Sequence, residues 1–169
     1  MARKMLIGLL LGLSAVSLAR AEEPRVAFPA GYATKFTNYL SLDRVQNPDQ
    51  IIRLFANEAA LEAAGKSAEL PDGSVLVGEV YAARKDADGN VVTSSLGRRV
   101  RDKLVAVAVM EKRQGWGADF PEELRNGDWD FAIFSPDGKP LDKDINACRS
   151  CHAPLKESQH VFSLQHLVK

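Results

Sequence analysis

Alternating apolar and polar residues, the pattern typical of β-strands, recur through the middle of the chain. One strand is predicted from Ser74 to Ala82, directly after a Pro-Asp-Gly turn. Its alternation divides the side chains between two faces: Val75, Val77 and Tyr81 on one, and Leu76, Gly78, Val80 and Ala82 on the other. The acidic, glycine-containing segment 86–90 then predicts a hairpin turn.

Two further strands are predicted towards the C-terminus. Residues 103–111 are apolar on both faces, as expected of a central strand that is covered on both sides. Residues 128–135 alternate again and end in a Ser-Pro-Asp-Gly turn. The small residues Ala106 and Ala108, like Gly78, would leave room beside the sheet for a bulky group. That group could be a porphyrin or a closely packed helix, and the pattern favours neither.

The N-terminal half is less regular. Aromatic residues at helix-like spacing predict a short amphipathic helix over residues 30–38. Residues 47–65 fit either one long helix, or a strand from Gln50 to Ala56 followed by a short helix with Asn57 as its N-cap. The β-rich run Ile-Ile-Arg-Leu-Phe favours the second possibility. Together these elements predict an α+β domain, a mainly antiparallel sheet with a few short helices.

The first 21 residues have the organisation of a secretory signal peptide. Arg3 and Lys4 precede an apolar run over residues 5–18, and Ala19-Arg20-Ala21 supplies small residues for cleavage. The run is shorter than the roughly 20 apolar residues that a membrane-spanning helix needs. We therefore expect residues 1–21 to be removed, and residues 22–169 to form a single domain in the bacterial periplasm.

The charge balance narrows the range of partners. The chain has 22 Lys+Arg and 22 Asp+Glu. This balance gives no reason to expect a nucleic acid or an anionic membrane surface as partner.

The chemistry is concentrated near the C-terminus, where Cys148-Arg149-Ser150-Cys151-His152 forms a Cys-x-x-Cys-His motif. This is the pattern for covalent attachment of a c-type haem. The thiols of Cys148 and Cys151 would reach the two vinyl groups on one porphyrin edge, and His152 would bind the iron. The chain has only these two cysteines, which fits one covalent haem c and no structural disulfide.

Two other interpretations of the cysteines compete with the haem. A Cys-x-x-Cys pair in an exported protein can be a disulfide or a thioredoxin-like redox site, although the βαβ setting of that site is missing here. Cys148, Cys151, His160 and His166 could instead bind zinc, with a shorter gap than zinc fingers usually have. Only the haem requires His152 directly after Cys151, so we favour it.

The sixth iron ligand would decide the function, because an open site admits small molecules. Met110, His160 and His166 are the available side chains, but Met110 lies in a predicted strand and both histidines follow His152 closely. We therefore expect five-coordinate iron. A basic cluster, consisting of Arg98, Arg99, Arg101 and Lys103, could pair with the haem propionates or form a solvated strand edge, which is the commoner case.

Several segments together resemble the cytochrome P-460 family, which includes the β-sheet cytochromes c′-beta. They are the ACxxCHAPxK…VFS segment (147–163), the Pro-Asp-Gly-Ser-Val run (71–75) with an Asn-capped helix before it, Phe-Pro-x-Gly-Tyr (28–32), Gly-Trp-Gly (115–117) and the strand at Trp129. The resemblance implies a β-rich domain with one c-type haem, often in a homodimer. It assigns the proximal ligand to His152 and the thioethers to Cys148 and Cys151, and it favours strand followed by helix over residues 50–65.

One departure from the family pattern changes the expected activity. The hydroxylamine-oxidising members carry a strand lysine that cross-links to the porphyrin, and the corresponding residue here is Gly78. The resemblance then implies a c′-beta-like protein that transfers electrons or binds NO or CO behind an apolar cap. Cap candidates are Phe55, Tyr81, Phe131 and Phe134, although ordinary core packing is the commoner role for each of them. The alternatives are an oxidoreductase acting on hydroxylamine or nitric oxide, and a zinc-stabilised binding module.

Overall fold

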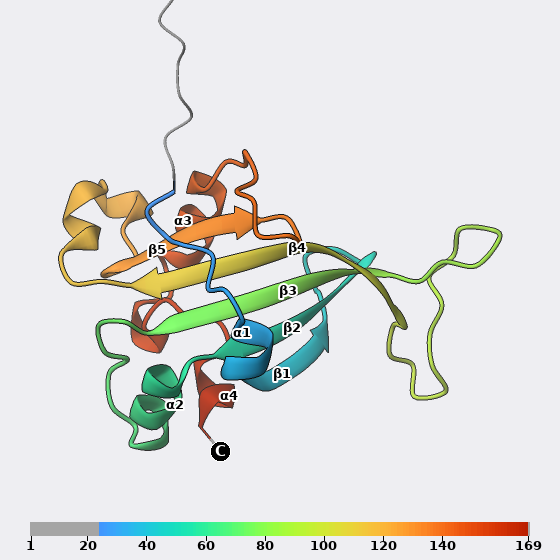
Figure 1. The fold of residues 1–169 in the computed structure, drawn as a ribbon, viewed down its shortest axis with the longest axis horizontal. Coiled ribbons are helices and arrows are strands. Elements are labelled where there is room, and N and C mark those ends of the chain that lie inside the picture. The colour runs from blue at the N-terminus through green and yellow to red at the C-terminus, as the bar shows by residue number, and fades with distance from the viewer. Residues whose placement is uncertain (1–23, 169) are drawn as a thin grey trace, which may run out of the picture.

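The computed structural model describes residues 24–168, so the expected signal peptide lies outside the described residues. Five strands form one antiparallel sheet in the order β1-β2-β3-β4-β5 (Figure 1). The strands are β1 Thr37–Asp43, β2 Gln50–Ala56, β3 Val75–Ala83, β4 Arg101–Lys112 and β5 Trp129–Phe134. The α+β class predicted from the sequence is confirmed.

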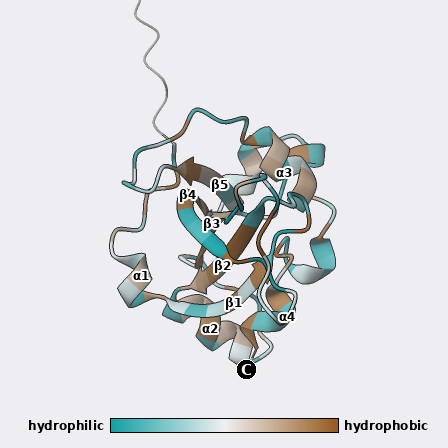
Figure 2. Cartoon of the chain, turned by 90° about the vertical axis from the view of Figure 1, so that its right-hand side faces the viewer, coloured by the Kyte–Doolittle hydropathy of each residue, from teal (hydrophilic) through white to brown (hydrophobic). Residues whose placement is uncertain are grey.

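Short helices surround the sheet. They are α1 Tyr32–Lys35, α2 Glu58–Gly65, α3 Asn146–His152 and α4 Leu164–Leu167, with 3₁₀ turns η1 Trp116–Asp119, η2 Glu122–Leu124 and η3 Lys156–Ser158. Helices α1 and α3 lie on opposite sides of the sheet (Figure 2). Within residues 24–168 no helix is long and apolar enough to cross a membrane.

The sheet separates two apolar cores, because successive side chains of a strand point to opposite faces. On one face, Leu76, Met110 and Phe131 pack with residues of α2 and α4. On the other face, Val77 and Val109 pack with the N-terminal segment around Val26 and α1. The face assignments predicted for β3 are therefore confirmed: Leu76 and Val77 belong to different cores.

The predicted helix over residues 30–38 is wrong in length. Helix α1 ends at Lys35, and the chain continues as the edge strand β1 from Thr37. The register of β1 against β2 shifts between Asn38 and Leu40. This irregularity interrupts the alternation of β1, and Tyr39 also stands at a helix-like spacing from Tyr32 and Phe36 in the sequence. Both features hide the strand pattern.

Asn57 joins the strand and helix predicted for residues 50–65. Its side-chain oxygen accepts hydrogen bonds from the backbone N–H of Ala60 at 3.2 Å and of Val75 at 3.1 Å. Its side-chain nitrogen donates to the carbonyl of Gly73 at 2.8 Å. One side chain thus caps α2 and fixes the start of β3.

A long arm, residues 84–100, connects β3 to β4 and projects from the sheet (Figure 1). Two isolated bridges, Lys85 to Val91 and Thr93 to Arg99, hold it together. Arg99 also donates to the carbonyls of Arg44, Asn47 and Gln50, at 2.9, 3.1 and 2.9 Å. The base of the arm is therefore tied to the β1–β2 loop.

Replacing Asn57 with Ala should lower the free energy of unfolding by about 2 kcal/mol, because helix capping and two further hydrogen bonds are lost together. Urea denaturation followed by circular dichroism would measure this. Asn90→Ala is the matched control, since the Asn90 side chain makes one long hydrogen bond of 3.4 Å in the exposed arm. Equal stability of the two variants would contradict the role of Asn57.

Candidate functional site

The Cys-x-x-Cys-His motif lies on α3, where the spacing of residues 148, 151 and 152 places all three side chains on neighbouring positions of one helical side. Both cysteines are free thiols. Cys148 is half-buried and packs against the core that includes Leu76 and Phe131, whereas Cys151 is exposed. Burial raises the pKa of the Cys148 thiol, and the positive charge of Arg149 partly opposes this shift. The segment therefore presents two reduced thiols beside an imidazole.

An ion pair fastens α3 to the sheet. Arg149, between the two cysteines, donates to one carboxylate oxygen of Asp130 from Nε at 3.0 Å and from Nη2 at 2.6 Å. Asp130 is buried in β5. The guanidinium of Arg149 also lies 4.2 Å from the ring centre of Phe120. Neither Arg149 nor Asp130 was singled out from the sequence, because 19 residues separate them.

Asn126 also bonds to the same helix. Its buried side-chain nitrogen donates to the carbonyl of Leu124 at 2.9 Å and to that of Arg149 at 3.1 Å. The next residue, Gly127, has a positive φ of 56°, and a Cβ there would lie 3.5 Å from the His160 ring. Asn126 thus bonds to α3, and Gly127 lies close to the segment that follows α3.

The imidazole of His152 is held with one nitrogen satisfied. Nδ1 lies 2.7 Å from the backbone carbonyl of His160, to which it can donate. Among residues 24–168, Nε2 has no hydrogen-bond partner. The rings of Phe131 and Phe162 flank the imidazole, with centroids at 4.9 and 4.8 Å. Burial lowers the pKa of His152, so the structure favours the neutral imidazole that metals bind.

Beside this imidazole, one face of the sheet is only partly covered. The half-buried aliphatic residues share the face of Phe131, which contacts His152; they are Leu40, Leu42, Ile52, Leu54, Ala106, Ala108 and Ile133. Gly78 lies on the same face, where an added Cβ would meet Ile52 Cδ1 at 3.1 Å and Leu54 Cδ2 at 3.5 Å. An apolar surface thus adjoins two thiols and a nitrogen donor.

Three of the four cap candidates lie elsewhere. Phe55 and Phe134 belong to the opposite core, and the Tyr81 hydroxyl donates to Glu79 on that opposite face at 3.0 Å. Side chains alternate between the two faces of a strand, and these three residues occupy positions that face away from the side of Gly78 and Phe131. Of the four candidates, only Phe131 lies on the side of His152.

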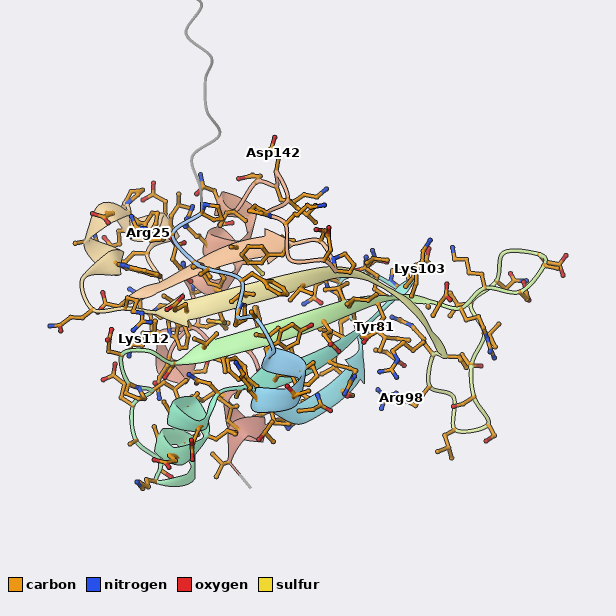
Figure 3. The ribbon with its side chains drawn as sticks, viewed as in Figure 1. Arg25, Tyr81, Arg98, Lys103, Lys112 and Asp142 are labelled. Carbon is orange, nitrogen blue, oxygen red and sulfur yellow. The ribbon has the colours of Figure 1, made fainter. Side chains whose placement is uncertain are left out.

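The arginines of the basic cluster predicted over residues 98–103 make contacts within the fold. Arg98 pairs with Asp43 at 3.2 Å, and Figure 3 places it below the end of β3 near Tyr81. The guanidinium of Arg101 lies 4.7 Å from the ring centre of Tyr81. Arg99 donates hydrogen bonds to loop carbonyls. These contacts agree better with a strand edge at the surface than with a site that binds the haem propionates.

The remaining candidate ligands do not form a metal site with His152. Met110 is buried in the core that includes Leu76 and Phe131. His160 lies beside His152, with its Nδ1 3.2 Å from the His152 carbonyl, and His166 is exposed on α4. In the described part of the chain, no three His, Cys, Asp or Glu side chains are arranged to hold a metal ion. The zinc alternative therefore gains no support.

Replacing Arg149 with Ala should lower the free energy of unfolding by about 3 kcal/mol, because it leaves the Asp130 carboxylate buried without its main partner. Arg149→Lys should lose less, since it keeps the charge. Urea denaturation would measure both, with Arg84→Ala in the exposed arm as the control. A loss for Arg149→Ala no greater than for the control would show that the ion pair is unimportant.

Comparison with known proteins gives the chain a family. The family model described as cytochrome P460 matches residues 29–163, a range that contains all five strands and the whole Cys148–His152 motif. No curated protein matches the chain. Because the matched range covers most of the chain, the chain belongs to the cytochrome P460 family.

Proposed function

We propose that the protein is a periplasmic monohaem cytochrome c that binds a diatomic gas, NO or CO, or transfers single electrons. Membership of the cytochrome P460 family supports a c-type haem cytochrome. The proposal of a ligand-binding haem iron rests on the hydrogen bonding of the His152 imidazole. Its Nδ1 is satisfied by a backbone carbonyl, while its Nε2 has no hydrogen-bond partner in the part of the chain that the structure describes. The imidazole lies beside two free thiols and a partly uncovered apolar face.

These residues fit a covalent haem. Cys148 and Cys151 would form the thioethers, and His152 would bind the iron through Nε2. The apolar porphyrin would lie against the aliphatic face of Ile52 and Leu54, removing these side chains from water. When bound, the haem supplies one-electron chemistry and an iron site for a gaseous ligand.

The surroundings of Gly78 favour a haem without a third covalent link. The side chains of Ile52 and Leu54 occupy the space above Gly78, where the cross-linking lysine of hydroxylamine-oxidising relatives is expected. The lysine nearest in sequence, Lys85, pairs with Asp49 at 2.8 Å in the arm. We therefore rank hydroxylamine or nitric oxide oxidation below gas binding and electron transfer.

Five-coordinate iron is part of the same proposal. Met110 is engaged in the core, and the aromatic residues that contact His152, Phe131 and Phe162, have no atom that binds iron. A partly uncovered aliphatic surface offers no strong ligand to iron, which favours small uncharged molecules there. The family resemblance implies a homodimer, and single-electron transfer would need a separate redox partner protein.

Protein matured in a periplasm should carry one haem that resists extraction by acid acetone, and its ferrous form should bind CO. Pyridine-haemochrome spectra would measure the first property, and optical titration the second. His152→Ala should keep the thioethers but lose the high-spin, histidine-ligated spectrum, while Cys148→Ser with Cys151→Ser should remove covalent haem. Wild-type protein without covalent haem would refute the proposal.

Hydroxylamine should not be oxidised by the wild-type protein, because residue 78 cannot form a link to the porphyrin. The test is reduction of an artificial electron acceptor in the presence of hydroxylamine, together with the visible spectrum of the ferrous protein. A strongly red-shifted, chlorin-like spectrum or hydroxylamine-dependent turnover would favour the enzyme alternative instead.

A further inference from the structure

Two consecutive residues just after the motif, Gln159 and His160, have left-handed backbone conformations. Their φ angles are 53° and 61°, although neither residue is glycine. Such a conformation costs roughly 1–2 kcal/mol for each residue that has a Cβ. Backbone strain of this kind persists only where surrounding contacts impose it, and it is frequent at functional sites.

This turn directs a carbonyl group at the proposed iron ligand. The carbonyl of His160 lies 2.7 Å from Nδ1 of His152, and the ring Nδ1 of His160 lies 3.2 Å from the carbonyl of His152. The backbone N–H of His160 donates to the carbonyl of Leu155 at 2.7 Å. These contacts close the turn onto the end of α3, so the orientation of the imidazole depends on where the turn lies.

The side chain of Gln159 attaches the turn to the rest of the fold. Its amide oxygen accepts a hydrogen bond of 2.7 Å from the backbone N–H of Leu70, which lies 89 residues earlier. Leu70 is fully buried, and its carbonyl accepts a hydrogen bond of 2.7 Å from the ammonium of Lys112. Lys112 ends β4 (Figure 3). The Leu70 peptide is thus held by the sheet on one side and holds Gln159 on the other.

We propose that Gln159 is a positioning residue for the His152 imidazole, acting through the carbonyl of His160. The inference rests on the proposed function, in which His152 binds the haem iron. A hydrogen bond from the distant ring N–H to a carbonyl fixes the tautomer of a metal-bound histidine and raises its basicity. By holding the His160 carbonyl in place, Gln159 strengthens the bond from His152 to iron and stabilises the ferric state.

Three substitutions at Gln159 separate the side-chain hydrogen bond from the backbone conformation. Gln159→Ala removes the bond to Leu70 and keeps the strain. Gln159→Gly removes the same bond but favours the left-handed backbone. Gln159→Glu keeps an acceptor oxygen at the same reach. Gln165→Ala, on the exposed side of α4, is the control, and urea denaturation shows which variants remain folded.

The readouts are the iron–histidine stretching frequency of the ferrous protein by resonance Raman spectroscopy, and the reduction potential. The Ala and Gly variants should both show a lower frequency and a higher potential, while the Glu variant should keep the wild-type frequency. Neither readout should move in the Gln165→Ala control.

Unchanged frequencies in haem-containing Ala and Gly variants would overturn the role of Gln159 and leave the proposed function intact. A shift in Ala alone would also overturn it, because backbone conformation and not the Leu70 bond would then be responsible. Absence of covalent haem from the wild-type protein would refute the proposed function, and this inference with it.

Discussion

The ion pair between Asp130 and Arg149 joins the sheet to the helix that carries the motif. A carboxylate as buried as that of Asp130 is stable only with a charged partner in good geometry. Arg149 supplies this partner from between the two cysteines and also lies over the ring of Phe120. Rotation of α3 would break these contacts, so the pair sets which way Cys148 and His152 face.

The sheet gives the molecule two different sides. On the side of α1, the buried carboxylate of Glu79 accepts hydrogen bonds from Tyr32, Tyr81 and Arg53. Burial, together with the Glu79 charge, raises the pKa of Tyr32 far above its ordinary value, so the phenol stays protonated. On the side of α3, the surface around Gly78 is aliphatic and partly uncovered. Neighbouring residues of β3 therefore lie in two different environments. Glu79 belongs to a buried hydrogen-bonded network, and Gly78 belongs to an apolar surface suited to a porphyrin.

Much of the fold follows from local patterns. The strands β3 and β5 show alternation, β4 is apolar on both faces, and Asn57 with the β-rich run before it indicates the strand and helix over residues 50–65. Strand β1 was missed because its register shift next to Leu40 disturbs the alternation. Three of the four cap candidates lie on the opposite face of the sheet, because aromatic character does not reveal which face of a strand a residue occupies.

The sequence by itself determined the chemistry of the motif, because thiols three residues apart and an adjacent imidazole need only one helical turn to act together. Tertiary structure decided everything that holds this group in place. The partners of Arg149 and Gln159 lie 19 and 89 residues away. The contact of His152 is a backbone carbonyl, which every residue possesses and which no residue type can signal. Only folding brings such groups within hydrogen-bonding distance.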